Sequence, residues 1–213
     1  MRKRTICMLV AILLILPSLL ITEVNASQIP VDYDIDYWYS NVDEMGIWGI
    51  SSISVYVGSN SSQTSLSVAN LKSYLSTAMT SWSVTKISIS YASSQNNAKL
   101  GLGGITRAEA TSISIPSNVV GVTSFPTQKQ IARLYYSSSE KALYSITRAE
   151  VLLIESTQTS TVAGAKKVLV HEMGHVLGYY GHYDNGRVMT TYYEDITSLT
   201  PSTDEKNHLG QMY

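Results

Sequence analysis

Residues 162 to 176 carry the pattern that most restricts how this chain can fold, because apolar side chains recur there at the spacing of a helix. The stripe comprises Val162, Ala165, Leu169, Met173 and Val176, which indicates a helix starting near Ser160. A helix with one apolar stripe must bury that stripe against a second layer of structure. We therefore expect a layered fold in which this helix packs on a sheet.

Five segments have the alternation or the apolar runs that are typical of strands. They cover residues 53–57, 86–91, 98–105, 118–125 and 151–156, and Pro126 is expected to stop the fourth of them. Residues 66–82 have helical spacing and predict a second long helix. The pentapeptide ITRAE occurs at 105–109 and 146–150, and both copies are interpreted as strand-end or turn segments.

The order of these segments predicts an α/β fold of the α+β kind. We expect a twisted mixed sheet with two long helices on one face, and a small C-terminal subdomain that ends in a helix over 204–213. Pro201 and Ser202 provide a start for that last helix, on which His208 is expected to be an ordinary surface histidine.

The first 26 residues have the features of a secretory signal peptide, with three basic residues, an apolar run interrupted by Pro17, and Ala26 before the expected cleavage site. The alternative is a membrane anchor, but the apolar run is shorter than the roughly 20 residues of a bilayer span. We expect residues 27–213 to form one domain, with residues 27–47 as a possible N-terminal extension. Cleavage removes Cys7, so the mature chain has no thiolate ligand and no disulfide.

The net charge gives no support to two classes of partner. Removing Arg2, Lys3, Arg4 and Glu23 from a chain of formal charge −1 leaves a net charge of −3. A weakly acidic domain gives no reason to expect nucleic acid or, after signal cleavage, a membrane surface as partner.

HEMGHVLGYYGH, residues 171–182, carries the chemistry. His171 and His175 are four residues apart on the predicted helix, so their rings can approach one metal ion, and neutral imidazoles suit zinc. Glu172 lies where its carboxylate can take a proton from a water that the metal activates. The alternative is that two histidines share this spacing by accident, which is improbable in a chain with four histidines.

The stretch HEMGHVLG resembles the HExxHxxG helix of the metzincin metalloproteases, and its surroundings look most like the matrixin branch. The resemblance implies a metzincin-like zincin fold in which Gly178 ends the helix and a third histidine completes the zinc site. Here that histidine is His182, one residue later than in the family. The excess falls in a loop with glycine at both ends, where it can be absorbed as a wider turn. Asp184 is the reserve ligand, and a site with two histidines and an extra water is the remaining alternative.

The resemblance extends to RVMTTYY, where Met189 looks like the methionine of the family's Met-turn. The family's tyrosine position is Thr191 here, so that role is not transferred. Tyr192 or Tyr193 lines a specificity pocket or is a structural phenol. Residues 118–127 look like the edge strand along which such proteases bind peptide as an added antiparallel strand.

The resemblance implies a secreted, extracellular zinc-dependent endopeptidase that acts as a monomer on protein or peptide substrates. His171, His175 and His182 would hold one catalytic Zn²⁺, and Glu172 would be the general base. The sequence has no recognisable calcium-binding loop, and calcium binding is left as an open alternative. Two other hypotheses are a secreted zinc-binding or adhesive protein without turnover, and an inhibitory leader formed by the acidic residues after position 27.

Overall fold

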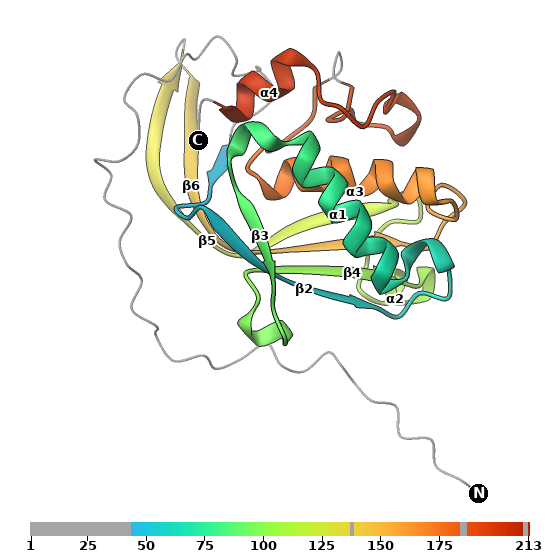
Figure 1. The fold of residues 1–213 in the computed structure, drawn as a ribbon. Helices are drawn as coiled ribbons and strands as arrows, with labels where there is room; N and C mark the ends of the chain where they lie inside the picture. The colour runs from blue at the N-terminus through green and yellow to red at the C-terminus, as the bar shows by residue number, and fades with distance from the viewer. Residues whose placement is uncertain (1–43, 137–138, 184–186, 211–212) are drawn as a thin grey trace, which may run out of the picture.

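The structure is a computed structural model that describes residues 44–136, 139–183, 187–210 and 213 (Figure 1). The expected signal peptide, the greater part of the expected N-terminal extension and Asp184 lie outside these residues. None of the helices in the described ranges has the length and apolar character that a membrane span requires.

A mixed sheet forms one layer of the fold. Its strands are β1 (Glu44–Ile47), β2 (Ser52–Ser59), β3 (Ser88–Tyr91), β4 (Leu100–Ile105), β5 (Gly121–Tyr136) and β6 (Ser139–Ile154). The order is β1-β6-β4-β2-β3, and β5 pairs with β6. Every pairing is parallel except that of β5 with β6. The prediction of a mixed sheet is therefore confirmed.

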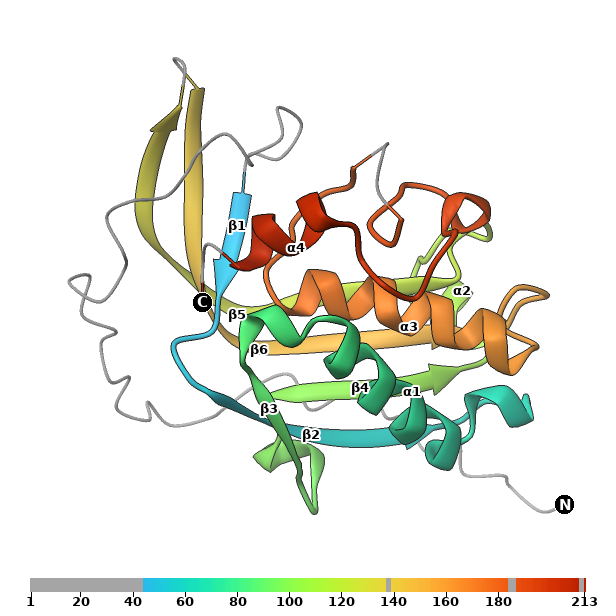
Figure 2. The ribbon, with the colours of Figure 1, turned by 45° about the horizontal axis from the view of Figure 1, so that its top comes forward.

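Two long helices, α1 (Val68–Ser81) and α3 (Val162–Val176), cover the same face of this sheet (Figures 1 and 2). The side-chain oxygens of Ser67 and Thr161 cap their first turns by accepting from backbone N–H groups. The predicted stripe of α3 is buried except at Val162, which is 52% exposed at the first position of the helix. The two predicted helices and the face that they cover are confirmed.

The described residues between α3 and the helix α4 (Thr203–Gly210) form little regular structure apart from one short 3-10 helix, η6 (Tyr193–Asp195). Further short helices lie between the strands: η3 (Thr64–Leu66), η4 (Ser83–Thr85), η5 (Gln95–Asn97) and α2 (Arg107–Ser112). The predicted surface position of His208 is wrong, because its side chain is fully buried and its ring lies 4.3 Å from that of Tyr179. α4 packs inward through His208 and Leu209.

Two strand boundaries also differ from prediction. Pro126 does not stop its strand, because β5 runs on to Tyr136. The pairing with β6 is irregular between Ser124 and Thr127, and a proline without an N–H is tolerated at such a bulge on an edge strand. The predicted strand at 151–156 is only the end of β6, whose earlier part is too polar to read as buried.

The two copies of ITRAE adopt different structures. In the first copy Ile105 ends β4, and Thr106 and Glu109 form a capping box at the start of α2. The second copy lies inside β6, so the prediction of a strand end or turn is wrong there. Pairing with two neighbouring strands decides the structure of the second copy, and a pentapeptide cannot encode such pairing.

Candidate metal site

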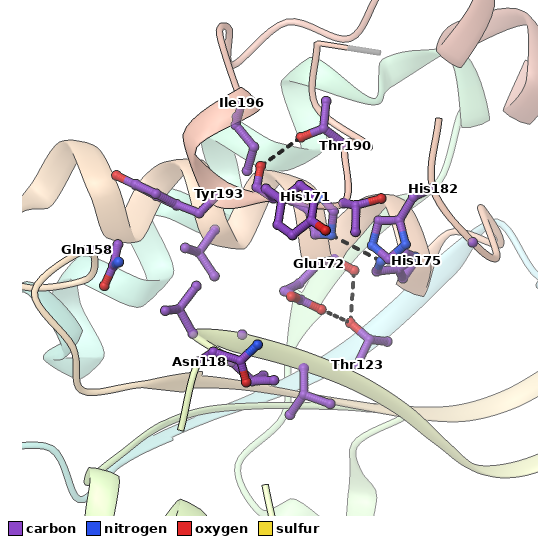
Figure 3. Close-up of a pocket in the computed structure, with 18 of the residues that line it drawn as sticks. Asn118, Thr123, Gln158, His171, Glu172, His175, His182, Thr190, Tyr193 and Ile196 are labelled. Carbon is purple, nitrogen blue, oxygen red and sulfur yellow. Dashed lines mark hydrogen bonds between the residues drawn. The ribbon is translucent and has the colours of Figure 1, made fainter. Parts of the chain in front are cut away.

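His171 and His175 lie one turn apart on α3 and face the same point (Figure 3). Their Nε2 atoms are 3.2 Å apart, and their rings are nearly perpendicular, at 87°. Two ligands held at about 2.0–2.1 Å from a tetrahedral zinc ion are separated by about 3.3 Å. The spacing of the two nitrogens therefore suits one shared zinc ion.

Backbone carbonyls fix the tautomer of both rings. The Nδ1 atom of His171 donates to the carbonyl of Val188, and that of His175 donates to the carbonyl of Tyr179, each at 2.7 Å. A carbonyl only accepts, so both Nδ1 atoms carry the proton and both Nε2 atoms present lone pairs. Burial lowers the pKa of both histidines, which keeps the rings neutral. Two lone pairs that face each other repel unless a cation lies between them, so this donor set fits a metal.

His182 reaches the same point from the loop that follows α3 (Figure 3). Its ring centroid lies 5.2 Å from that of His171 and 5.1 Å from that of His175. One ligand atom from each of the three histidines lies within 4.8 Å of the others, and no other group of this kind occurs among the described residues. The lengthened loop thus brings the third histidine to the pair.

Two glycines allow the backbone conformation of this loop. Gly178 has a φ of 108° and Gly181 a φ of 86°, so the backbone is in the left-handed region on both sides of the two tyrosines. The N–H of Gly178 donates to His175 and that of Tyr179 to Gly174, which is the Schellman arrangement at a helix end. The expected helix-ending role of Gly178 is confirmed.

Glu172 is the buried carboxylate beside the histidines. It is 5% exposed, and its Oε2 accepts a hydrogen bond of 2.7 Å from Thr123 Oγ1 on β5. Burial raises the pKa of Glu172 to about 7, against the smaller lowering effect of that hydrogen bond. A carboxyl with a pKa near neutrality can both take and return a proton at physiological pH.

Met189, the residue of the Met-turn resemblance, packs against α3 at Gly174, one residue before His175. It is fully buried, and a Cβ added at Gly174 of α3 would overlap its sulfur. The residue that holds this turn is Glu205, which no sequence pattern marked as part of the site. Its Oε1 accepts from the backbone N–H groups of Arg187, Val188 and Met189 at 2.6–3.0 Å.

A sequence signal for Glu205 does exist. Ser202 and Glu205 have the S-x-x-E spacing of a capping box, and each accepts a hydrogen bond from the backbone N–H of the other. The motif predicts the start of α4. It does not predict that the other carboxylate oxygen reaches a turn 16 residues earlier.

The histidines and Glu172 open into a cleft of about 770 Å³ between α3 and β5. Val168 and Ile196 supply apolar walls, and Tyr192 and Tyr193 both line the cleft. β5 borders it as an edge strand, because its only partner among the described strands is β6. A peptide could therefore pair with the free side of this strand next to the histidines.

A comparison with protein-family models finds the family described as Matrixin, whose model matches residues 48–213. A search of curated proteins finds no match for this chain. The family match covers both long helices, the histidine cluster and all of the described sheet apart from β1.

Proposed function

The chain belongs to the matrixin family of metallopeptidases, and on this premise we propose that it is a zinc-dependent endopeptidase. His171, His175 and His182 are the proposed metal ligands, and Glu172 is the proposed general base. The observation that carries the proposal is the pair of Nε2 lone pairs 3.2 Å apart beside a buried carboxylate with a raised pKa.

A zinc ion held by the three imidazoles would supply Lewis acidity, which acidifies water and polarises a peptide carbonyl. Glu172 then takes the proton from the attacking water. Thr123 holds the carboxylate in place from β5. Because the pKa of Glu172 is about 7, the same group can pass the proton to the departing amine.

The substrate is a protein or peptide chain that lies extended in the cleft. The free side of β5 supplies backbone donors and acceptors from Gly121 onward, and Pro126 interrupts them because it has no N–H. The walls formed by Val168 and Ile196 would bury an apolar side chain of the peptide. Backbone hydrogen bonds with β5 would hold the scissile peptide bond over the histidines. The apolar walls of the cleft would select the side chain next to that bond.

Export is a separate part of the proposal and rests on residues 1–26, with cleavage after Ala26. An exported chain whose N-terminus is Ser27 by mass spectrometry would support it. Retention of residues 1–26 in the exported chain would exclude cleavage and favour an anchor.

The peptidase proposal is tested by the substitution Glu172→Ala, with Asp204→Ala as a control that removes an exposed carboxylate from α4. The wild type and the control should cleave casein or gelatin, and this cleavage should stop when a chelator is added. The Glu172 variant should bind one zinc ion and cleave neither protein. A zinc-loaded wild type without activity would favour the hypothesis of a zinc-binding protein without turnover, and an active Glu172 variant would remove that residue from the mechanism.

A further inference from the structure

The last carbonyls of α3 are hydrogen-bonded by groups from both ends of the described chain. A helix leaves its final carbonyl groups without partners inside the helix, and buried carbonyls need others. The Schellman hydrogen bonds satisfy those of Gly174 and His175. The next three carbonyls, at 176, 177 and 178, accept from residues far away in the sequence, and that of Gly178 also accepts from the N–H of Tyr180 at 3.0 Å.

Three residues supply these donors. Trp48 Nε1 donates to the carbonyl of Val176 at 2.7 Å, and the hydroxyl of Tyr213 donates to that of Leu177 at 2.8 Å. The backbone N–H of Gly46, in β1, donates to the carbonyl of Gly178 at 3.3 Å. The Tyr213 hydroxyl also accepts from the backbone N–H of Trp48 at 3.3 Å, which links the two ends. We call Gly46, Trp48 and Tyr213 the clasp.

The clasp acts on the segment between the second and third histidines. Residues 176–178 directly follow His175, whose Nδ1 is held by the next carbonyl, that of Tyr179. A Cβ added at Gly46 would lie 2.7 Å from the hydroxyl of Tyr180, so β1 also touches the middle of the loop that leads to His182. The same hydroxyl of Tyr180 donates to Gln128 Oε1 at 2.7 Å, so β5 also holds this tyrosine.

A loop with one residue more than the family spacing needs such support. Two left-handed glycines make the turn sterically accessible, but they also raise the entropy of the loop in the absence of contacts. Trp48 is only 2% exposed, so its hydrogen bond is shielded from water. Gly46 precedes the region that the family model matches, which begins at residue 48.

We propose that Gly46, Trp48 and Tyr213 are positioning residues for the metal site: they fix the end of α3 and the loop that carries His182. The inference rests on the proposed metal ligands but does not require peptide cleavage. It also assigns a role to the end of the predicted extension, because residues 44–47 must stay with the domain. A leader that is removed has to end before β1.

The test is Trp48→Phe in the full chain, which deletes the indole N–H and keeps an aromatic ring. The matched control is Trp82→Phe, because Trp82 Nε1 donates at 2.8 Å to the carbonyl of Val170, six residues before the last residue of α3. The ring of Trp82 lies 6.5 Å from that of Tyr179, and phenylalanine retains an aromatic ring there. Two quantities are measured: the zinc dissociation constant, by competition with a chromophoric chelator, and hydrogen exchange of residues 177–182 in the metal-free protein.

Trp48→Phe should weaken zinc binding by about 10-fold, in the range known for groups that orient metal ligands, and should speed exchange in the loop. Trp82→Phe should lower thermal stability and leave both quantities unchanged. If Trp48→Phe does not fold, Tyr213→Phe removes a single hydroxyl and should give the same two effects.

Unchanged zinc affinity and unchanged loop exchange in the clasp variants would overturn the inference, as would equal effects in the Trp82 control. A wild-type chain that binds no zinc would instead refute the proposed function. In that case the exchange comparison still decides whether the clasp orders the loop.

Discussion

Replacing Glu172 by Gln should stabilise the metal-free protein while removing the proposed catalytic base. The carboxylate is buried beside β5, and its pKa rises from an ordinary value of 4.5 to about 7 because burial penalises the ionised form. The folded chain therefore binds a proton more tightly than the unfolded chain does. Between pH 4.5 and 7 the folded state holds more protons, so its stability falls as the pH rises and then levels off.

The size of the effect follows from the two pKa values. One pKa unit corresponds to about 1.4 kcal/mol, so a rise from 4.5 to about 7 costs the wild type about 3 kcal/mol above neutrality. Glutamine cannot ionise and can still accept the hydrogen bond from Thr123. Glu172→Gln should therefore match the wild type near pH 4.5 and exceed its free energy of unfolding by about 3 kcal/mol at pH 8.

Urea denaturation between pH 5 and 8, with a chelator present, measures this difference. The histidines titrate in both proteins, so their contribution cancels in the comparison. Glu155→Gln is a control of opposite sign, because hydrogen bonds from Ser61 and Ser62 lower the pKa of Glu155 and stabilise its ionised form. That variant should be less stable than the wild type at neutral pH. A Glu172→Gln difference that does not change with pH would refute the argument from burial.

Three further substitutions test the site. His182→Ala should weaken zinc binding by more than the roughly 10- to 100-fold that outer partners of metal ligands contribute, and unchanged affinity in a competition titration would point to another ligand. Glu205→Ala leaves the buried backbone N–H groups of Val188 and Met189, and the partly buried one of Arg187, without their acceptor and should cost about 3 kcal/mol in urea denaturation, whereas the exposed Asp204→Ala should change little. Gly174→Ala places a methyl group against Met189 and should lower the unfolding free energy by about 1–3 kcal/mol, and an unchanged value would mean that the turn moves freely.

Local patterns predicted the parts of this protein that depend on local physics. The spacing of His171 and His175 fixes their rings on one side of a helix, and glycine at 178 and 181 allows the turn that returns His182. The two long helices follow from their apolar stripes in the same way. Each of these features involves residues within one helix or one loop, so a short window of sequence contains the relevant interactions.

The features that the sequence did not predict are contacts between distant segments. The burial of His208, the reach of Glu205 to the Met189 turn and the strand pairing at 44–47 all depend on which segments become neighbours. Pro126 was expected to end a strand, and only the position of β5 at the sheet edge makes it tolerable there. Hydrophobic periodicity contains no information of this kind, because it describes one element at a time.

All three proposed zinc ligands fall within 12 consecutive residues, whereas the clasp that holds the segment between the second and the third comes from both ends of the described residues. An unfolded chain therefore keeps the complete set of imidazoles close together and retains some affinity for the ion. Zinc then shifts the folding equilibrium only by the ratio of its affinities for the two states. The remote scaffold, rather than the ligand set, determines how strongly the metal favours the native form.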